Sequence, residues 1–406
     1  MPKSQVSRRN FNYSTIMKKI YFVALTIIAS MFASCSLFDG KTPETSTTKL
    51  YPAMDASAEN WGFIDNKGNF VIPPMFDDVE GFSCGYARVS MGEDYKFINT
   101  KGQFQTTPSF DWAESFYNGY AVVGLDENQG LMKSSFDMTI QPYFYRLGTM
   151  GDNGLSAAKR TNDGKYEYVD AKGEAKIPAM YDRADIFQDG VAIIALGNKY
   201  GAINKAGEFT IQPTYEYGLW NMTEGLVGFY DKNEKAGFMD KNGNIIAPAI
   251  YYGVGYASDG LIIYGGKDKC GYLNKKGEIV IAEMYYAAEQ FTEGLAWVKQ
   301  NEDSKYWQCI NKENQVVFRL GEDETPAAGF HNGLALVFVD YEDGYGYKYV
   351  DVNGMLVYSW KYTYEDYDDE DYYDEWGAPK KAQKRDFKSE KKAFLDMTLH
   401  FDSRKL

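Results

Sequence analysis

The stretch Trp61-Gly62-Phe63-Ile64-Asp65-Asn66-Lys67-Gly68 decides the fold, because close copies of it return along the chain. Tyr200-Gly201-Ala202-Ile203-Asn204 is one such copy. Others begin at Ala236 and Cys270, and looser copies begin at Tyr95, Gln129, Tyr166, Trp307 and Tyr347. These make nine copies. Self-similarity of this kind indicates a repeat architecture, in which each unit buries its apolar face against its neighbours.

A second landmark fixes the period of the repeat. A glycine followed by a short apolar run occurs eight times, at Gly85, Gly119, Gly154, Gly190, Gly225, Gly260, Gly294 and Gly333. The spacings between successive glycines are 34, 35, 36, 35, 35, 34 and 39 residues. The repeat unit is therefore about 35 residues long.

Each copy of the opening stretch predicts a β-hairpin. Alternating side chains at its start are typical of a strand. The fifth residue is Asp or Asn in eight of nine copies, and Gly follows three residues later in seven, as in Asp65 and Gly68. This pattern favours a tight turn with a left-handed residue. The returning strand ends near a proline, such as Pro248, and the Gly-led motif predicts a third strand.

A large aromatic residue recurs eleven residues after the Asp or Asn position or its equivalent. Regular aromatics in a repeat predict core side chains that pack between neighbouring units, although a row of exposed rings would instead suit stacking on sugars. The seven positions are Phe76, Phe110, Phe144, Tyr181, Tyr215, Tyr251 and Tyr285. We expect burial. Aromatics outside the repeat pattern are the candidates for a binding surface: Trp112, Trp220, Trp297 and Trp360.

These motifs resemble the WG-repeat family of WG-containing β-repeats over about residues 61–358. The resemblance implies a repeat scaffold and transfers no catalytic residues. We expect an all-β chain of three-stranded repeats in an elongated open array, or solenoid. The alternative is a closed, propeller-like ring, but propeller blades typically have four strands.

The N-terminal region predicts an export signal over residues 1–34, with Met17 as the better start. Lys18 and Lys19 precede the apolar run from Ile20 to Phe32, which is too short to span a bilayer and suits a signal peptide. The residues before Cys35 resemble a lipobox, which implies lipidation of Cys35. Residues 35–60 then form a tether, and the other three cysteines are expected to be free or buried. An ordinary secretory signal is the alternative.

The composition argues against several classes of function. The formal net charge of −14 disfavours binding to phosphate backbones, so no nucleic-acid partner is expected. Only two histidines are present, which leaves little material for a Ser-His-Asp centre or a His-rich zinc site. We expect no metal, no cofactor and no catalytic residues.

Residues 359–406 form an expected tail after the last repeat. Eight carboxylates lie between Glu365 and Glu375, and a basic stretch with a partly helical pattern follows. Blocks of like charge are usually solvated.

Together these features predict a non-catalytic binding or scaffold lipoprotein of the bacterial cell envelope, anchored in the outer membrane. Its partner would be a protein or a polysaccharide. A glycan-active enzyme that uses paired carboxylates and a purely structural spacer are the alternatives.

Overall fold

The computed structural model describes residues 49–363 except 57, 93 and 106–109. The chain divides into two compact units, one of residues 1–26 with 365–406 and the other of residues 27–364, and the described residues belong to the second. The regular elements of the described part are all β-strands, which confirms the all-β prediction there. No described helix is long and apolar enough to cross a membrane.

The strands form nine antiparallel sheets, numbered here as blades 1 to 9 in chain order. Blades 1 to 3 comprise β1 (Tyr51–Met54), β2 (Trp61–Ile64) and β3 (Phe70–Phe76); β4 (Asp78–Val79), β5 (Tyr86–Met91) and β6 (Asp94–Asn99); and β7 (Trp112–Ala113), β8 (Tyr120–Leu125), β9 (Asn128–Lys133) and β10 (Met138–Phe144). Blades 4 to 6 comprise β11 (Arg146–Leu147), β12 (Ser156–Lys159), β13 (Tyr166–Val169) and β14 (Ala175–Tyr181); β15 (Arg183–Ala184), β16 (Ala192–Leu196), β17 (Lys199–Ile203) and β18 (Phe209–Tyr215); and β19 (Leu219–Asn221), β20 (Leu226–Tyr230), β21 (Ala236–Asp240) and β22 (Ile245–Tyr251). Blades 7 to 9 comprise β23 (Gly253–Ser258), β24 (Leu261–Gly265), β25 (Cys270–Asn274) and β26 (Ile279–Tyr285); β27 (Ala287–Ala288), β28 (Leu295–Lys299), β29 (Gln308–Asn311) and β30 (Val316–Arg319); and β31 (Glu324–Pro326), β32 (Leu334–Tyr341), β33 (Gly344–Asp351) and β34 (Leu356–Thr363).

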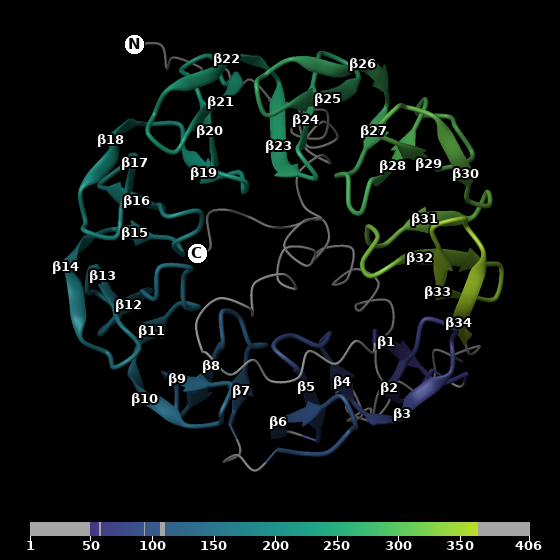
Figure 1. The fold of residues 1–406 in the computed structure, drawn as a ribbon, viewed down its shortest axis with the longest axis horizontal. Helices are drawn as coiled ribbons and strands as arrows, with labels where there is room; N and C mark the ends of the chain where they lie inside the picture. Colours follow the sequence, from purple (N-terminus) through teal and green to yellow (C-terminus); the bar gives the residue numbers. More distant parts are fainter. Residues whose placement is uncertain (1–48, 57, 93, 106–109, 364–406) are drawn as a thin grey trace, which may run out of the picture. The chain divides into compact units, whose positions relative to one another are not determined.

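Within this unit the blades follow one another round a closed ring, so the prediction of an open array was wrong (Figure 1). Blade 1 packs directly against blade 9. The hydroxyl of Tyr349 donates to the carbonyl of Pro52 at 2.9 Å, and that of Tyr358 donates to the carbonyl of Met54 at 2.9 Å. The rings of Trp61 and Trp360 meet edge to face with centroids 5.9 Å apart. The alternative, a propeller-like ring, is the observed architecture.

Seven of the nine blades have four strands, whereas the sequence predicted three. The additional strand is the innermost one and is usually two or three residues long, as in β7, β15 and β27. So short a strand shows no alternation of apolar and polar residues, which is why the sequence did not reveal it. The recurring glycine lies in the tight turn between this strand and the next. In seven of the eight copies the glycine and the residue before it both have positive φ, as in Asp189-Gly190, with φ of 54° and 83°. Such pairs form the primed two-residue turns of hairpins.

The turn between the third and fourth strands is built as predicted. At Asp240 the Oδ1 atom accepts hydrogen bonds from the N–H groups of Asn242 and Asn244 at 2.8 and 2.9 Å. The N–H of Gly243 donates to the carbonyl of Asp240 at 3.0 Å, and Gly243 has a φ of 85°. The carbonyl and carboxylate of one residue thus organise the whole turn, which explains the Asp or Asn preference.

Five of the nine copies have glycine at the second position, where a close approach of backbones requires it. A Cβ on Gly237 would lie 2.6 Å from the carbonyl oxygen of Ala247 on the outermost strand. That strand is bulged at Pro248, between the pairs Phe238↔Ala247 and Ala236↔Tyr251. The bulge therefore brings Tyr251 opposite the first residue of the copy.

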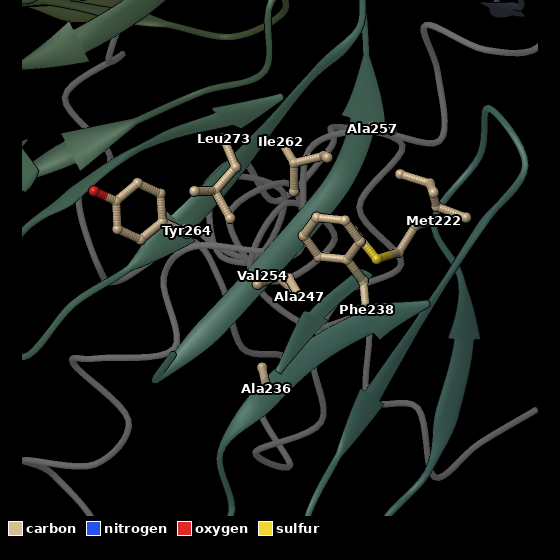
Figure 2. Packing of buried hydrophobic residues seen from close by; sticks show 10 residues of the cluster. Met222, Ala236, Phe238, Ala247, Val254, Ala257, Ile262, Tyr264 and Leu273 are labelled. Carbon is tan, nitrogen blue, oxygen red and sulfur yellow. The ribbon is translucent and has the colours of Figure 1, made fainter. Parts of the chain in front are cut away.

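The recurring aromatic residues fill the space between blades. Five of the seven are buried, which confirms the prediction for Phe76, Phe110, Phe144, Tyr181 and Tyr285. Tyr215 and Tyr251 are half-buried and pack against the adjoining clusters. Figure 2 shows the core between blades 6 and 7, where Phe238 and Met222 meet Val254 and Ile262.

Hydrogen bonds also join the blades on the face that carries the first-to-second and third-to-fourth turns, called here the turn face. Asp189 of blade 5 accepts through Oδ2 from the N–H of Gly225 in blade 6 at 2.9 Å. Lys241, also in blade 6, donates to the carbonyl of Asp189 at 3.1 Å. Asp259 repeats the arrangement with Gly294 of blade 8.

The expected signal peptide, Cys35 and its tether up to residue 48, and the tail from residue 364 lie outside the described residues. Of the other cysteines, Cys270 and Cys309 are free and buried, as expected. Cys84 is disulfide-bonded, so the expectation of a free thiol was wrong at that position.

The close approach at Gly237 predicts a large effect of one added methyl group. Gly237→Ala should lower the free energy of unfolding by about 1–3 kcal/mol, since the outer strand has to move away from the new Cβ. Urea denaturation followed by intrinsic fluorescence measures this. Gly253→Ala is the matched control, because no atom lies within 4 Å of its added Cβ. Equal stability of the two variants would contradict the packing account.

The turn aspartates predict a dependence of stability on pH. The N–H of Asn69 lowers the pKa of Asp65 below its ordinary value of 3.8. Partial desolvation alone would raise the pKa of Asp240, but hydrogen bonds from Asn244 and Asn242 outweigh it and lower that pKa too. Ionisation of both groups therefore favours the folded state at neutral pH. This contribution is lost as the pH falls from about 3.8 through the lower folded-state pKa.

The test uses the double variant Asp65→Asn/Asp240→Asn, because Asn occupies the same turn position in other repeats, such as Asn204. Wild type should be the more stable protein at pH 7, and the difference should shrink between pH 4 and pH 2. Urea unfolding at each pH measures the difference. Asp163→Asn, in an exposed loop, is the control. A difference in stability between wild type and the double variant that does not vary with pH would contradict this prediction.

Candidate functional site on the loop face

The face opposite the turn face carries the remaining connections of the ring. Because the strands of each blade are antiparallel, the second-to-third connections and the links between blades lie on this side, called here the loop face. Loops on a rigid scaffold are the usual place for binding residues.

At three junctions the loop face is tied down by an aspartate that directly follows the recurring aromatic. Asp77, Asp111 and Asp182 each accept through Oδ2 from a backbone N–H in the second-to-third turn of the next blade. The donors are Gly92 at 2.6 Å, Asp126 at 2.8 Å and Gly197 at 2.7 Å. This contact is called here the loop-face latch.

Between blades 5 and 8 other residues take the latch position. They are Glu216 at the junction of blades 5 and 6, Tyr252 at the next junction and Tyr286 at the one after it. Tyr145 stands there between blades 3 and 4. A tyrosine has no carboxylate to accept the backbone N–H, so the adjoining turn is not held in the same way.

A pocket of about 240 Å³ lies at the junction of blades 5 and 6. Its lining is Thr214, Tyr215, Glu216, Tyr217, Phe229, Tyr230, Asp231 and Lys232. Four of these eight side chains are aromatic. Tyr230 also packs against Trp220, with ring centroids 4.9 Å apart. The pocket is a shallow hollow open to solvent rather than an enclosed cavity.

Three tyrosines are strongly exposed on this sector of the loop face. Tyr217 is 51% exposed, Tyr252 is 54% exposed and Tyr306, in the second-to-third loop of blade 8, is 43% exposed. They are called here the tyrosine platform. Lys235 lies over the ring of Tyr252 as a cation–π partner. Large exposed rings of this kind are a feature of interaction surfaces.

The connections around the platform carry almost no net charge. The segments 216–218, 231–235, 266–269 and 300–307 contain six acidic and five basic residues, although the whole chain has a net charge of −14. The carboxylate of Asp231 is occupied by its own turn, since its Oδ1 accepts the N–H groups of Asn233 and Lys235, both at 2.9 Å. The pKa of Asp231 is lowered, chiefly by the hydrogen bond from Lys235.

The four tryptophans predicted to form a binding surface are not brought together. Trp297 and Trp360 are 1% and 3% exposed, so they are core residues. Trp112 and Trp220 are half-buried on the inner strands of blades 3 and 6 and cover Gly124 and Gly228, where a Cβ would lie within 2.1 Å of the rings. Among the four, only Trp220 adjoins the pocket, through its contact with Tyr230.

A second group of polar residues directly follows the inner strands. Glu80, Glu114, Asp185 and Glu289 occupy equivalent places, each five residues before a recurring glycine. Enclosure raises the pKa of Glu289 to about 8 and that of Asp185 to about 6. The side chain of Asp185 is exposed, however, so water screens it and we expect a smaller rise there. No group of three or more metal-binding side chains occurs among the described residues.

Contacts within the inner group hold its carboxylates in place. Arg88 donates to Glu80 at 2.6 Å and to Asp78 at 3.1 Å. The hydroxyl of Thr149 donates to Glu114 at 3.0 Å. Desolvation raises the pKa of Glu114, the hydrogen bond from Thr149 opposes the rise, and the charge of Glu80 adds to it.

Sequence reasoning missed both groups, although each has a signal. The inner carboxylates recur at a fixed distance from Gly85, Gly119, Gly190 and Gly294. The platform is marked where tyrosine or glutamate replaces aspartate directly after the recurring aromatic, as in Tyr251-Tyr252 compared with Tyr181-Asp182. Reading that difference requires knowledge of the loop-face latch.

One solved structure shares the fold of this chain. The chain superposes on the crystal structure of a eukaryotic initiation factor with a TM-score of 0.57 and 11% identity, over 79% of this chain and 98% of that one. The dihydro-haem d1 dehydrogenase NirN in complex with DHE superposes with a TM-score of 0.42 and 12% identity, over 78% of this chain and 74% of that one. Hsv2 of Kluyveromyces marxianus superposes with a TM-score of 0.35 and 7% identity, over 61% of this chain and 94% of that one. At these identities the first shares only the fold, and the other two are too distant to support an argument. No curated protein gives a significant match.

Six segments of the sequence match the family described as WG containing repeat: residues 61–95, 97–128, 168–200, 200–235, 237–265 and 271–306. The unmatched stretches hold the divergent copies that begin at Gln129, Trp307 and Tyr347. The matches cover blades with the same turns, bulges and aromatic contacts. The chain therefore belongs to the WG containing repeat family, and its repeats form the nine blades of a closed β-propeller.

Proposed function

We propose that this protein is a non-catalytic binding scaffold of the bacterial cell envelope, anchored in the outer membrane by a lipid on Cys35. Its partner, a polysaccharide or a protein, binds on the tyrosine platform. The observation that carries the proposal is the coincidence, between blades 5 and 8, of exposed tyrosines, an aromatic pocket and the replaced latch residues.

The physical argument starts from the cost of exposing a ring. Water solvates the faces of Tyr217 and Tyr252 poorly, so covering them with a partner is favourable. The ring of blades fixes the backbone beneath both residues, which limits the entropy lost on binding. Few interface residues usually provide most of the binding energy, and exposed aromatics are prominent among them.

A protein partner is favoured by a different observation. Ile245, Ile250 and Ile279 lie on the outermost strands of blades 6 and 7 and are each 60% exposed. Exposed aliphatic side chains on neighbouring strands are suited to contacts with protein. This surface is the rim of the ring, so it is a second candidate surface for a protein, in addition to the tyrosine platform.

The rival enzyme proposal would use the inner carboxylates Glu80 and Glu114. Arg88 forms an ion pair with Glu80, and the hydroxyl of Thr149 donates a hydrogen bond to Glu114. These contacts suit fixed electrostatic roles better than proton transfer. Cleavage of a glycan by the purified protein, abolished in Glu114→Gln, would favour the enzyme instead.

The anchor is tested by Cys35→Ala, which should abolish lipid labelling and release the protein from membranes. Stable anchoring needs more than one acyl chain, so loss of the modified cysteine removes it. Chemistry adds a second readout. One sulfur atom cannot carry both a lipid thioether and a disulfide. Mass spectrometry that finds Cys35 in a disulfide, and no lipid on it, would refute the anchor.

The platform is tested with purified full-length protein and the envelope fraction of the source cells. The double variant Tyr217→Ala/Tyr252→Ala should show at least about tenfold weaker saturable retention on the envelope fraction than the wild-type protein. This loss corresponds to about 1.4 kcal/mol of binding free energy. Both side chains are exposed, so the variant should keep the wild-type unfolding midpoint. Tyr143→Ala, an exposed tyrosine on the outer strand of blade 3, is the control. Wild-type retention of the double variant would refute the proposal.

A further inference from the structure

We infer that the ligand of the tyrosine platform is a neutral polysaccharide chain that runs along the loop face from the junction of blades 5 and 6 to blade 8. The inference rests on the proposed function, because it names the ligand of the same site. It follows from the kind of side chain exposed, from its repetition and from the charge of the surroundings.

The kind of side chain points to sugar rings. The platform exposes flat aromatic rings, and the C–H face of a pyranose packs well against such a ring. The hydroxyls and the neighbouring polar groups can bond to sugar hydroxyls. Around Tyr217 these groups are Thr214, Glu216 and Lys232, which line the same pocket. The exposed aliphatic residues, which suit a peptide, lie instead on the outer strands.

The repetition of the tyrosines points to a polymer. Tyr217 and Tyr252 lie at successive junctions, and Tyr306 lies on the second-to-third loop of blade 8 on the same face. They stand at three different positions of the repeat unit: two residues after Tyr215, directly after Tyr251, and in the loop between β28 and β29. A single sugar would contact one of them, whereas an extended chain can place a ring on each. Contacts in series raise affinity with chain length, since each later contact forms within an already bound ligand.

The charge of the surroundings points to a neutral chain. With six acidic and five basic residues in the connecting segments, the sector has no field that would select a polyanion or a polycation. The carboxylate of Asp231 is also engaged by backbone N–H groups. The inner carboxylates belong to a different part of the ring and play no part in this site.

The experiment measures binding of the full-length protein to soluble neutral polysaccharides by affinity electrophoresis, with glucan, xylan, mannan and galactan as probes. Polygalacturonate and heparin are the acidic comparisons. Calorimetry with one to eight sugar units of the retained polymer then gives the length dependence. We expect retention by at least one neutral polymer, no measurable affinity for its monosaccharide, and affinity that rises with length.

The variants separate stacking from other roles. Tyr217→Ala, Tyr252→Ala and Tyr306→Ala should each weaken binding of the long oligosaccharide about five- to fiftyfold, and Tyr143→Ala should leave it unchanged. Tyr217→Phe, which keeps the ring and removes the hydroxyl, should retain most of the affinity. Loss of binding in Tyr217→Phe equal to that in Tyr217→Ala would overturn the stacking account.

Treatment of the envelope fraction distinguishes failure of this inference from failure of the proposed function. Periodate, which destroys sugar rings, should abolish platform-dependent retention, and protease should not. Retention that is lost after protease treatment but not after periodate would mean that the platform binds a protein. That result would support the proposed function and contradict the glycan inference. Retention that is independent of the platform tyrosines would refute both. Binding to the acidic polymers alone, or to none of the neutral ones, would also overturn the inference.

Discussion

The propeller depends on the packing of one large aromatic side chain from each of the first seven repeats against the next blade. A single blade is a small sheet that cannot bury its own apolar faces, so its stability comes from its neighbours. Tyr251 reaches its place because the outer strand bulges at Pro248 and lies against the bare backbone of Gly237. The same bulge pairs Trp61 with Phe76 in blade 1. The glycine, the bulge and the aromatic therefore act together in the five blades that have the glycine, which are blades 1, 3, 5, 6 and 7.

Closure of the ring needs a different device, because no strand is shared between blades 1 and 9 in the described part of the chain. Aromatic packing and hydrogen bonds between blades 1 and 9 hold the ring closed instead, and this contact is called here the seam. Tyr349 and Tyr358 bind carbonyl groups of β1, and the hydroxyl of Tyr51 donates to the carbonyl of Asn332 at 2.7 Å. Burial of Trp360 beside Trp61 completes the seam. The high tyrosine content of the last repeat thus has a structural reason.

The sequence predicted features that depend on local chemistry and missed those that depend on several blades. The turn at Asp240 and Gly243 and the burial of Phe144 follow from residue type and spacing alone. The inner strand at Trp112 is too short to have a period, and ring closure depends on the relative twist of whole sheets. Trp297 was considered as a surface residue because it lies outside the repeat pattern, yet it fills a gap beside Phe330. A residue that departs from the repeat pattern marks an unusual position, but the pattern does not show whether its side chain points into the core or to the surface.

The contacts on the two faces support the proposal that the partner binds on the loop face. The turn face is held by contacts in which the acid of one blade binds the backbone of the next, as Asp189 binds Gly225. A change there affects both the turn and its neighbour. On the loop face, Asp182 can be exchanged for Tyr252 at the corresponding position at the cost of one exposed hydrogen bond, worth about 0.5–1.5 kcal/mol. The core beneath still packs through Tyr181 or Tyr251. Such a position can acquire an exposed ring without loss of the fold, so a sector where the exchange recurs at neighbouring junctions is better explained by binding than by stability.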